Sequence, residues 1–415
     1  MRKSSKADAT SLRPATRLVL GGRDPLANHG FVNPPVHHAS TVLYRTAEDF
    51  LARRSRYLYG RRGTPTSEAL ETALRDLEGP DCAGVALLPS GLAAISTALL
   101  SMLQAGDHVL ITDSVYLPTR KFCDDMLKRY GIETTYYDPM IGSDIAGLMK
   151  ANTRGVFVEA PGSLSFEVQD VPAIAAAVHA AGALVLMDNT WASPLYFRAL
   201  EKGVDLSIQA GTKYIGGHSD VMLGTISANA RTWERVNDMV HLLGLCVGPD
   251  DMYLGLRGLR TMGVRLAQHH RSGLQVARWL ASRPEIARVL HPALESCPGH
   301  SIWQRDFSGA SGLFSIVFTP VAAAAVNAFL DELTLFGIGA SWGGFESLAI
   351  PFECASIRTA TKWAPGGPTV RLHIGLEDVD DLLRDLERGF TALAAASAQG
   401  DHAASPAACR SRSSK

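Results

Sequence analysis

Beyond residue 67 the chain alternates between two patterns of apolar residues. Apolar residues spaced three and four apart predict amphipathic helices, which lie at 67–80, 92–103 and 171–182. Short apolar runs bounded by glycine or polar residues predict strands, which lie within 82–91, 107–113, 155–163, 183–191 and 204–214. Ser67 is a candidate N-cap for the first helix. Because strands and helices alternate, we predict an α/β fold whose mostly parallel central sheet is covered by helices.

The pattern changes beyond residue 250. A long helical stretch, 250–282, is followed by strand patterns within 312–320 and 369–378 and by a final helix at 379–396. These elements predict a smaller C-terminal α+β domain. Polar, small and charged residues at the two ends predict disordered tails. The expected segments are a tail, an N-terminal segment, a large domain, the C-terminal domain and a second tail, at residues 1–13, 14–64, 65–255, 256–396 and 397–415.

Composition narrows the class of protein. Of 415 residues, 46% are hydrophobic and 20% charged, and the net charge of -1 gives no electrostatic reason to bind nucleic acid or a membrane surface. We therefore expect a small-molecule substrate. No apolar run reaches a membrane span and the N-terminus lacks a secretory core, so the cytoplasm is the expected location. Six cysteines without CxxC spacing indicate reduced thiols, and we expect no metal site.

Candidate chemistry follows the predicted strands, where open α/β sheets collect their ligands. Ser90, Gly91 and Leu92 begin a helix and can hold an anion, although ordinary strand-to-helix turns look similar. Asp188 ends an apolar strand, as a buried charge that needs a partner or as a helix cap. Lys213 stands alone in the glycine-rich "IQAGTKYIGGHSD", where a solvated surface lysine is the common alternative. Together the three features fit pyridoxal 5'-phosphate (PLP), which needs a lysine, a carboxylate and a phosphate site.

Further motifs carry a resemblance to a known family. From about residue 15 to 395 the chain resembles the Cys/Met-metabolism, or trans-sulfuration, family of PLP-dependent enzymes, which have the fold type I of PLP-dependent transferases. The matching stretches, in chain order, are "VNPPVHHASTV", "YGRRGTPTSEALE", "LLPSGLAAIS", "APGSLSFEVQDVP", "LMDNTWASP", "IQAGTKYIGGHSDVMLGT", "LRGLRTMGVRL", "SWGGFESL" and "VRLHIGLEDVDDL".

The resemblance implies roles for the cofactor site. Lys213 would form the Schiff base, and Asp188 would pair with the ring nitrogen. Tyr116 would stack over the cofactor and take part in catalysis. The phosphate contacts would be Ser90, Gly91, Leu92 and Thr212.

It also implies a substrate site and an assembly. Arg371 would bind the substrate carboxylate beside Ser341 and Trp342. Tyr59 and Arg61, in an N-terminal arm, would reach the cofactor phosphate in the neighbouring subunit's active site, where Tyr59 would also take part in catalysis. The active unit would then be at least a dimer with shared sites, and the resemblance implies a homotetramer built as a dimer of dimers. We interpret His218 and Asp220 as structural residues of the glycine-rich turn.

Within the family the chain is similar to the cystathionine β-lyases, because of Trp342 and of Gly-Ser in "APGSLSFEVQD". The expected reaction is β-elimination of L-cystathionine to homocysteine, pyruvate and ammonia, as part of methionine biosynthesis. A broader cysteine-S-conjugate lyase or cysteine desulfhydrase, and a γ-acting cystathionine γ-synthase or γ-lyase, remain alternatives. Ala210 and His37-His38 depart from the family pattern, which leaves substrate preference open. A non-catalytic protein on this fold would have lost Lys213 or Asp188, and both are present.

Overall fold

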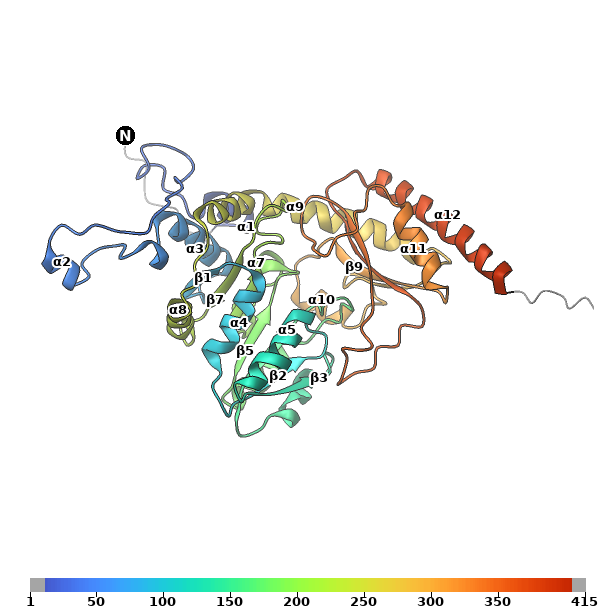
Figure 1. Cartoon of the computed structure of the whole chain (residues 1–415), viewed down its shortest axis with the longest axis horizontal. Helices are drawn as coiled ribbons and strands as arrows, with labels where there is room; N and C mark the ends of the chain where they lie inside the picture. Colours follow the sequence, from blue (N-terminus) through green and yellow to red (C-terminus); the bar gives the residue numbers. More distant parts are fainter. Residues whose placement is uncertain (1–11, 405–415) are drawn as a thin grey trace, which may run out of the picture.

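The computed structural model describes the backbone of residues 12–404 and the side chains of residues 12–398. Figure 1 shows a body of two domains with an arm projecting from one end. The strands are β1 (Gly84–Leu88), β2 (His108–Thr112), β3 (Glu133–Tyr137), β4 (Thr153–Glu159), β5 (Leu184–Asp188), β6 (Leu206–Ala210), β7 (Gly224–Ala228), β8 (Ile286–Leu290), β9 (Leu313–Phe318), β10 (Leu348–Phe352) and β11 (Thr369–His373). The α-helices are α1 (Pro14–Leu20), α2 (Ala47–Leu51), α3 (Pro65–Glu78), α4 (Gly91–Met102), α5 (Leu117–Lys121), α6 (Val171–Ala180), α7 (Ser193–Tyr196), α8 (Trp233–Leu242), α9 (Pro249–Ala281), α10 (His300–Asp306), α11 (Ala323–Glu332) and α12 (Val379–Ala404).

The large domain is built on a seven-stranded sheet in the order β1-β7-β6-β5-β4-β2-β3. The pairs among β2 to β6 are parallel, and β7 runs antiparallel between β1 and β6. Alternate residues of a strand face opposite sides: Val156 and Val158 pack toward α6, whereas Phe157 packs toward α4 and α8. Apolar residues on both faces are why the sequence pattern predicted a covered, mostly parallel sheet, and this prediction is confirmed.

The C-terminal domain contains a four-stranded antiparallel sheet in the order β10-β11-β9-β8, packed against α11 and α12. The long helix α9 connects the two domains, as Figure 1 shows. The smaller α+β domain expected from the sequence is therefore present. Helix α12 continues to Ala404, beyond the predicted end at residue 396. The tails were predicted at residues 1–13 and 397–415; the prediction was wrong for residues 397–404, which belong to α12, and residues 1–11 and 405–415 lie outside the described residues.

Helix α3 begins earlier than predicted. Its N-cap is Thr64, whose hydroxyl accepts the N–H of Ser67, while the Ser67 hydroxyl accepts the N–H of Thr64. The prediction that Ser67 is the N-cap was wrong because Pro65 fits the first helical position, where its missing N–H costs nothing. Ser67 instead completes a reciprocal capping box.

The arm spans residues 23–63 and extends away from the body with α2 at its tip (Figure 1). Several of its apolar side chains face solvent in the single chain, among them Leu43, which is 89% exposed, and Leu51, which is 80% exposed. Such exposure of apolar surface is typical of a segment that packs against another chain. Among the described residues, no helix is long and apolar enough to cross a membrane.

Candidate functional site

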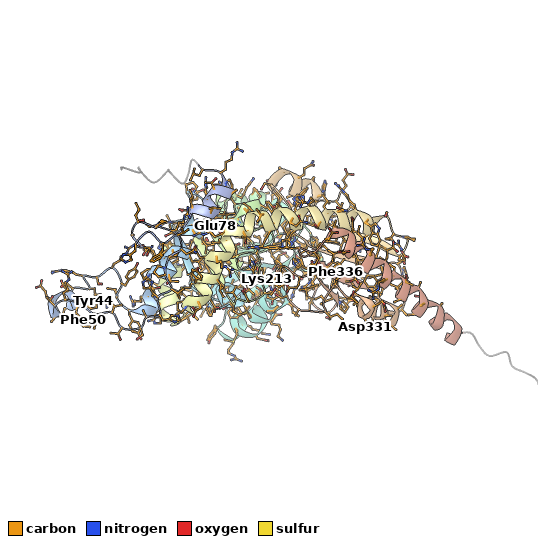
Figure 2. The ribbon with its side chains drawn as sticks, turned by 90° about the horizontal axis from the view of Figure 1, so that it is seen from above. Tyr44, Phe50, Glu78, Lys213, Asp331 and Phe336 are labelled. Carbon is orange, nitrogen blue, oxygen red and sulfur yellow. The ribbon has the colours of Figure 1, made fainter. Side chains whose placement is uncertain are left out.

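The candidate site lies where the parallel strands end. Asp188 is the last residue of β5, and the turn after β6 carries Lys213. The N–H of Lys213 donates to the Ala210 carbonyl, and the N–H of Gly217 donates to the Lys213 carbonyl, so the lysine sits in a tightly bonded turn. In Figure 2 Lys213 lies near the middle of the molecule, where the two domains meet.

The environment of Lys213 changes its acidity. Burial and, to a smaller extent, the charge of Arg371 lower the pKa of this amine to about 8, and the charge of Asp188 opposes both effects. The Nζ atom donates to the Ser341 hydroxyl at 2.5 Å and lies 5.4 Å from the centre of the Trp342 ring. A Cβ atom on Gly343 would lie 3.0 Å from that of Lys213, so glycine lets the loop approach the lysine.

The carboxylate of Asp188 is half-buried, so water solvates it poorly. Its Oδ1 accepts the N–H of Thr190 at 2.9 Å and the Thr190 hydroxyl at 2.5 Å. Burial raises the pKa of Asp188, while these two hydrogen bonds and the charge of Lys213 lower it. A carboxylate in this setting gains most from a cationic partner.

The C-terminal domain contributes Arg371, from the centre of β11. Its guanidinium donates to the Ser341 carbonyl at 2.9 Å, and burial lowers its pKa to about 10. Behind it, the N–H of Gly343 donates to Nε2 of the buried His373. The loop of Ser341 and Trp342 is therefore fixed between Arg371, His373 and Lys213. The structure thus brings Lys213, Arg371, Ser341 and Trp342 together.

The amino end of α4 lies at the same edge of the sheet. The Ser90 hydroxyl caps the helix by accepting the N–H of Ala93 at 3.1 Å. Helix geometry leaves the N–H groups of Gly91 and Leu92 without intrahelical partners, and the helix dipole favours an anion there. The Thr212 hydroxyl donates to the Leu223 carbonyl at 3.2 Å, next to this helix end. A Cβ atom on Gly91 would lie 2.6 Å from that of Ala210, so these two positions pack closely.

Tyr116 projects from the start of α5 with 44% of its surface exposed. Burial raises the pKa of its phenol, and the negative charge of Asp188 raises it further. The sequence reasoning missed Glu159, whose Oε2 accepts the N–H of Tyr116 at 2.8 Å. The sequence pattern that pointed to Asp188 also applies to Glu159, because each residue ends an apolar strand.

Tyr59 and Arg61 lie elsewhere in the single chain. They stand at the base of the arm, and Arg61 donates to the His241 carbonyl at 3.2 Å. Among the described residues no contact joins either to Lys213 or Asp188. His38 of the atypical His37-His38 pair lies 3.3 Å from Asp250, and the His218 Nδ1 pairs with the Gly216 carbonyl. The roles assigned to Tyr59, Arg61 and His218 stay predictions.

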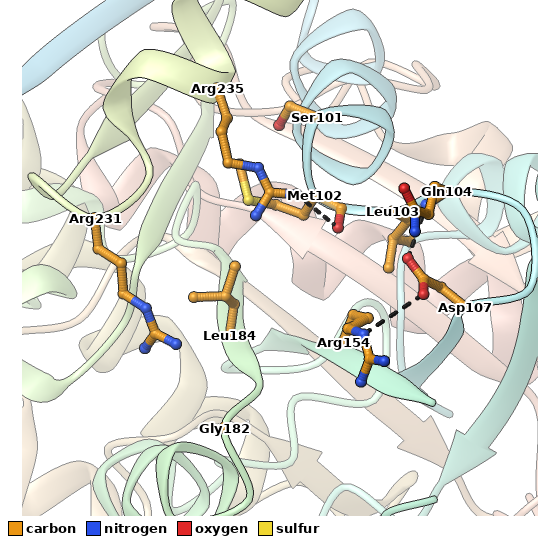
Figure 3. A pocket seen from close by; sticks show the side chains of 10 residues that line it. All are labelled: Ser101, Met102, Leu103, Gln104, Asp107, Arg154, Gly182, Leu184, Arg231 and Arg235. Atoms are coloured by element: carbon orange, nitrogen blue, oxygen red, sulfur yellow. Dashed lines mark hydrogen bonds and ion pairs between the residues drawn. The ribbon is translucent and has the colours of Figure 1, made fainter. Parts of the chain in front are cut away.

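A second hollow lies at the opposite edge of the large sheet (Figure 3). It has a volume of about 480 Å³ and borders the starts of β4 and β5. Two of the arginines that line it have partners in the chain. Arg235 donates to the Met102 carbonyl at 3.0 Å, and the Arg154 guanidinium lies 3.6 Å from the Asp107 carboxylate. None of the predicted site residues lines this hollow, so it is separate from the candidate site.

Comparisons with known proteins identify the family of the chain. Residues 15–391 match the model of the family described as Cys/Met metabolism PLP-dependent enzyme. The chain is 46% identical to the cystathionine beta-lyase of Escherichia coli over 90% of this chain and 97% of that protein. It is 45% identical to the cystathionine beta-lyase of Haemophilus influenzae, over 92% of this chain and 98% of that protein. The crystal structure of cystathionine gamma-lyase from Lactobacillus plantarum complexed with L-serine is 28% identical and aligns with a TM-score of 0.85 over 92% of this chain and 100% of that one.

Proposed function

Because the chain belongs to the Cys/Met metabolism family of PLP-dependent enzymes, we propose that it is a cystathionine β-lyase. The reaction converts L-cystathionine and water into homocysteine, pyruvate and ammonia. The meeting of Lys213, Asp188 and Arg371 at one edge of the sheet is the observation that carries the proposal, since it offers an amine, a carboxylate and a carboxylate-binding guanidinium in one place.

The residues present fit PLP. Asp188 is a half-buried carboxylate whose direct hydrogen bonds come from the uncharged Thr190, so a protonated ring nitrogen would supply a cationic partner. The free N–H groups of Gly91 and Leu92, with the hydroxyls of Ser90 and Thr212, suit the phosphate. Lys213, with its pKa lowered to about 8, suits attachment of the cofactor.

When bound, PLP supplies an electron sink for charge that develops on the substrate Cα. Lys213 would take the Cα proton of the substrate and return a proton to the departing sulfur of homocysteine. Asp188 would hold the ring nitrogen of the cofactor through its negative charge. Tyr116, half-exposed at the rim of the site, would pack against the cofactor ring.

Substrate orientation falls to the C-terminal domain. Arg371 binds the α-carboxylate through its planar guanidinium, and the Ser341 loop that it already holds forms the adjoining wall. Fixing the carboxylate fixes the Cα–H bond toward Lys213, which lowers the entropic part of the barrier.

Two features favour β-elimination over the γ-acting alternatives. Trp342 fills the wall beside Lys213, and its ring packs 5.5 Å from that of Tyr214. In addition, relatives of 45% and 46% identity carry the β-lyase name, whereas the γ-lyase structure shares 28%. A product assay determines the preference among cystathionine and other cysteine S-conjugates.

The proposed assembly is a homotetramer made of two dimers that share sites, acting in the cytoplasm. The exposed apolar residues of the arm support pairing with a second copy. Tyr59 and Arg61, which are remote from Lys213 in one chain, would complete the partner's phosphate site. A bidentate guanidinium is well suited to a phosphate.

The test is a product assay on the purified holoenzyme with L-cystathionine. Pyruvate and homocysteine in equal amounts, with Lys213→Ala reduced by about 10²- to 10⁴-fold, is the expected result. α-Ketobutyrate with cysteine would instead assign γ-elimination. Absence of turnover on cystathionine, together with turnover of cystine or cysteine, would assign the broader lyase activity.

A further inference from the structure

Glu159 and Asp188 end neighbouring strands side by side. Glu159 is the last residue of β4, Asp188 is the last of β5, and the two are partners in the parallel register. Paired residues of adjacent strands project to the same face of a sheet. The two carboxyl groups therefore share one small space at the edge that carries the candidate site.

Ionising both of two adjacent, half-buried carboxyl groups is unfavourable, because like charges repel. Asp188 has the stabilising partners: two hydrogen bonds from Thr190 and the nearby charge of Lys213. Burial raises the pKa of Glu159 well above its usual range, and the charge of Asp188 raises it further, whereas the N–H of Tyr116 and the more distant Arg358 lower it only in part. Of the two groups, Asp188 therefore has more partners that favour its charged form, and Glu159 holds a proton more readily.

Glu159 also anchors Tyr116. The N–H of Tyr116 donates to Glu159 Oε2, and Tyr116 is the N-cap of α5 without a side-chain cap of its own. The main chain of Glu159 is fixed by a further hydrogen bond, because the side chain of Gln169 donates to the Glu159 backbone carbonyl at 2.7 Å. The Tyr137 hydroxyl in turn donates to Gln169 at 2.9 Å. The carboxyl group of a residue whose main chain is fixed in this way thus holds the backbone from which the Tyr116 ring projects.

We propose that Glu159 is a positioning residue, a neutral carboxylic acid that holds Tyr116 in place and leaves Asp188 as the charged carboxylate of the site. The proposal rests on the proposed function, since it assigns Asp188 to the cofactor and Tyr116 to its face. The ionisable groups that face Glu159 are Asp188 on β5, Tyr116 before α5 and Arg358 from the C-terminal domain.

The test compares Glu159→Gln with Glu159→Ala in the PLP-loaded enzyme. Glutamine is neutral and offers an oxygen to the same N–H, so it should keep kcat/KM within about threefold of the wild type. Alanine releases Tyr116 and should lower kcat/KM by about tenfold or more, because a small displacement in a site is costly. A cofactor absorbance titration from pH 6 to 9, without substrate, should be the same for Glu159→Gln and wild type.

Glu78→Gln is the matched control. Glu78 is a buried carboxyl of the same domain, bonded to Ser207 outside the site, and burial raises its pKa to about 7. Its replacement should leave the absorbance titration unchanged. A Glu159→Gln enzyme as impaired as Glu159→Ala, or with a shifted titration, would overturn the proposal by showing that an ionised Glu159 is needed.

A substitute variant and the wild-type product assay distinguish failure of the anchoring role from failure to fold and from failure of the proposed function. If Glu159→Ala does not fold, Glu159→Asp replaces it, since the shorter acid keeps the proton but withdraws from the N–H of Tyr116. Equal kinetics and spectra for Glu159→Asp and Glu159→Gln would then contradict the anchoring role. If the wild type binds PLP but makes no pyruvate from L-cystathionine, the proposed function fails, while the absorbance titration still decides the role of Glu159.

Discussion

The position of Lys213 in the fold determines the pKa of its amine. An ordinary lysine is protonated at neutral pH and cannot attack a carbonyl group. Burial and the charge of Arg371 lower the pKa of Lys213, whereas Asp188 limits the shift by favouring the charged form. The balance gives an amine that is partly neutral near physiological pH and still has a counter-charge nearby.

A pH dependence follows for loading of the cofactor. The neutral amine is the reactive form, so the rate at which apoenzyme takes up PLP should rise as pH increases through about 8 and level off above it. Stopped-flow absorbance after mixing apoenzyme with PLP measures this rate. A rate that continued to climb toward pH 10 would mean that Lys213 keeps an ordinary pKa.

Most residues of the candidate site could be found from the sequence because each follows a recognisable strand or helix pattern. Lys213, Asp188 and Ser90 stand directly after apolar runs. Glu159 stands in the same way, but nothing in the sequence reveals that its strand lies beside β5. The contact with Tyr116 depends on this strand order, so only the fold could reveal it.

At the scale of elements, the position of α4 depends on close packing between small residues. Gly91 faces Ala210 at the end of β6, and Gly224 of β7 approaches the Ser90 carbonyl so closely that a Cβ atom would lie 2.0 Å away. These contacts set the distance between the helix end and the Lys213 turn. The proposed phosphate site therefore depends on positions where only small residues fit.

Replacement of Gly91 by alanine tests this dependence. The new methyl group would meet Ala210, push the helix end outward, destabilise the fold by about 1–3 kcal/mol and weaken PLP binding. Gly147→Ala is the control, because a Cβ atom there meets nothing within 4 Å. Urea unfolding and PLP dissociation measure the two effects. Equal behaviour of both variants would rule out a packing constraint at Gly91.

The elements that the sequence failed to predict have weaker patterns. Strand β3 is only partly buried and rich in threonine, and β7 consists largely of small residues, so neither forms a clear apolar run. Strands β8 and β10 were also missed, and both carry exposed positions. The capping of α3 was misassigned because Thr64 and Ser67 are both good cap residues and only the geometry separates them.

At the scale of the whole molecule, two features join parts that are far apart in sequence. The arm is proposed to reach a partner chain. The second feature is the segment 354–361, between β10 and β11, which we call the strap and which docks on the large domain. Asp113, at the end of β2, accepts N–H groups of Thr359 and Thr361, and Arg358 of the strap pairs with Glu167 at 3.1 Å.

Shared sites predict complementation between inactive variants. Arg61→Ala and Lys213→Ala should each be nearly inactive alone. In randomly mixed dimers, half the molecules would combine both chains and hold one intact site of two, giving about a quarter of wild-type activity. The measurement mixes subunits by co-expression with two affinity tags. Activity that stays at the level of the separate variants would contradict sharing of the site.

The strap predicts a link between domain docking and substrate affinity. Asp113→Asn replaces an acceptor of several N–H groups by an amide that can accept fewer, which should lower stability by about 1–3 kcal/mol and raise KM. Asp385→Asn is the control, since Asp385 binds Thr334 and Leu335 within the C-terminal domain alone. An equal rise of KM in both variants would show that the strap has no special role.

Lys213 is proposed to hold the cofactor at the edge of the sheet, close to Asp188 and Arg371. Reduction of the holoenzyme with borohydride, followed by proteolysis and peptide mass spectrometry, tests this attachment. The expected result is the mass of a phosphopyridoxyl group on the peptide that contains Lys213. The same mass on a peptide carrying any other lysine, or on none, would contradict it.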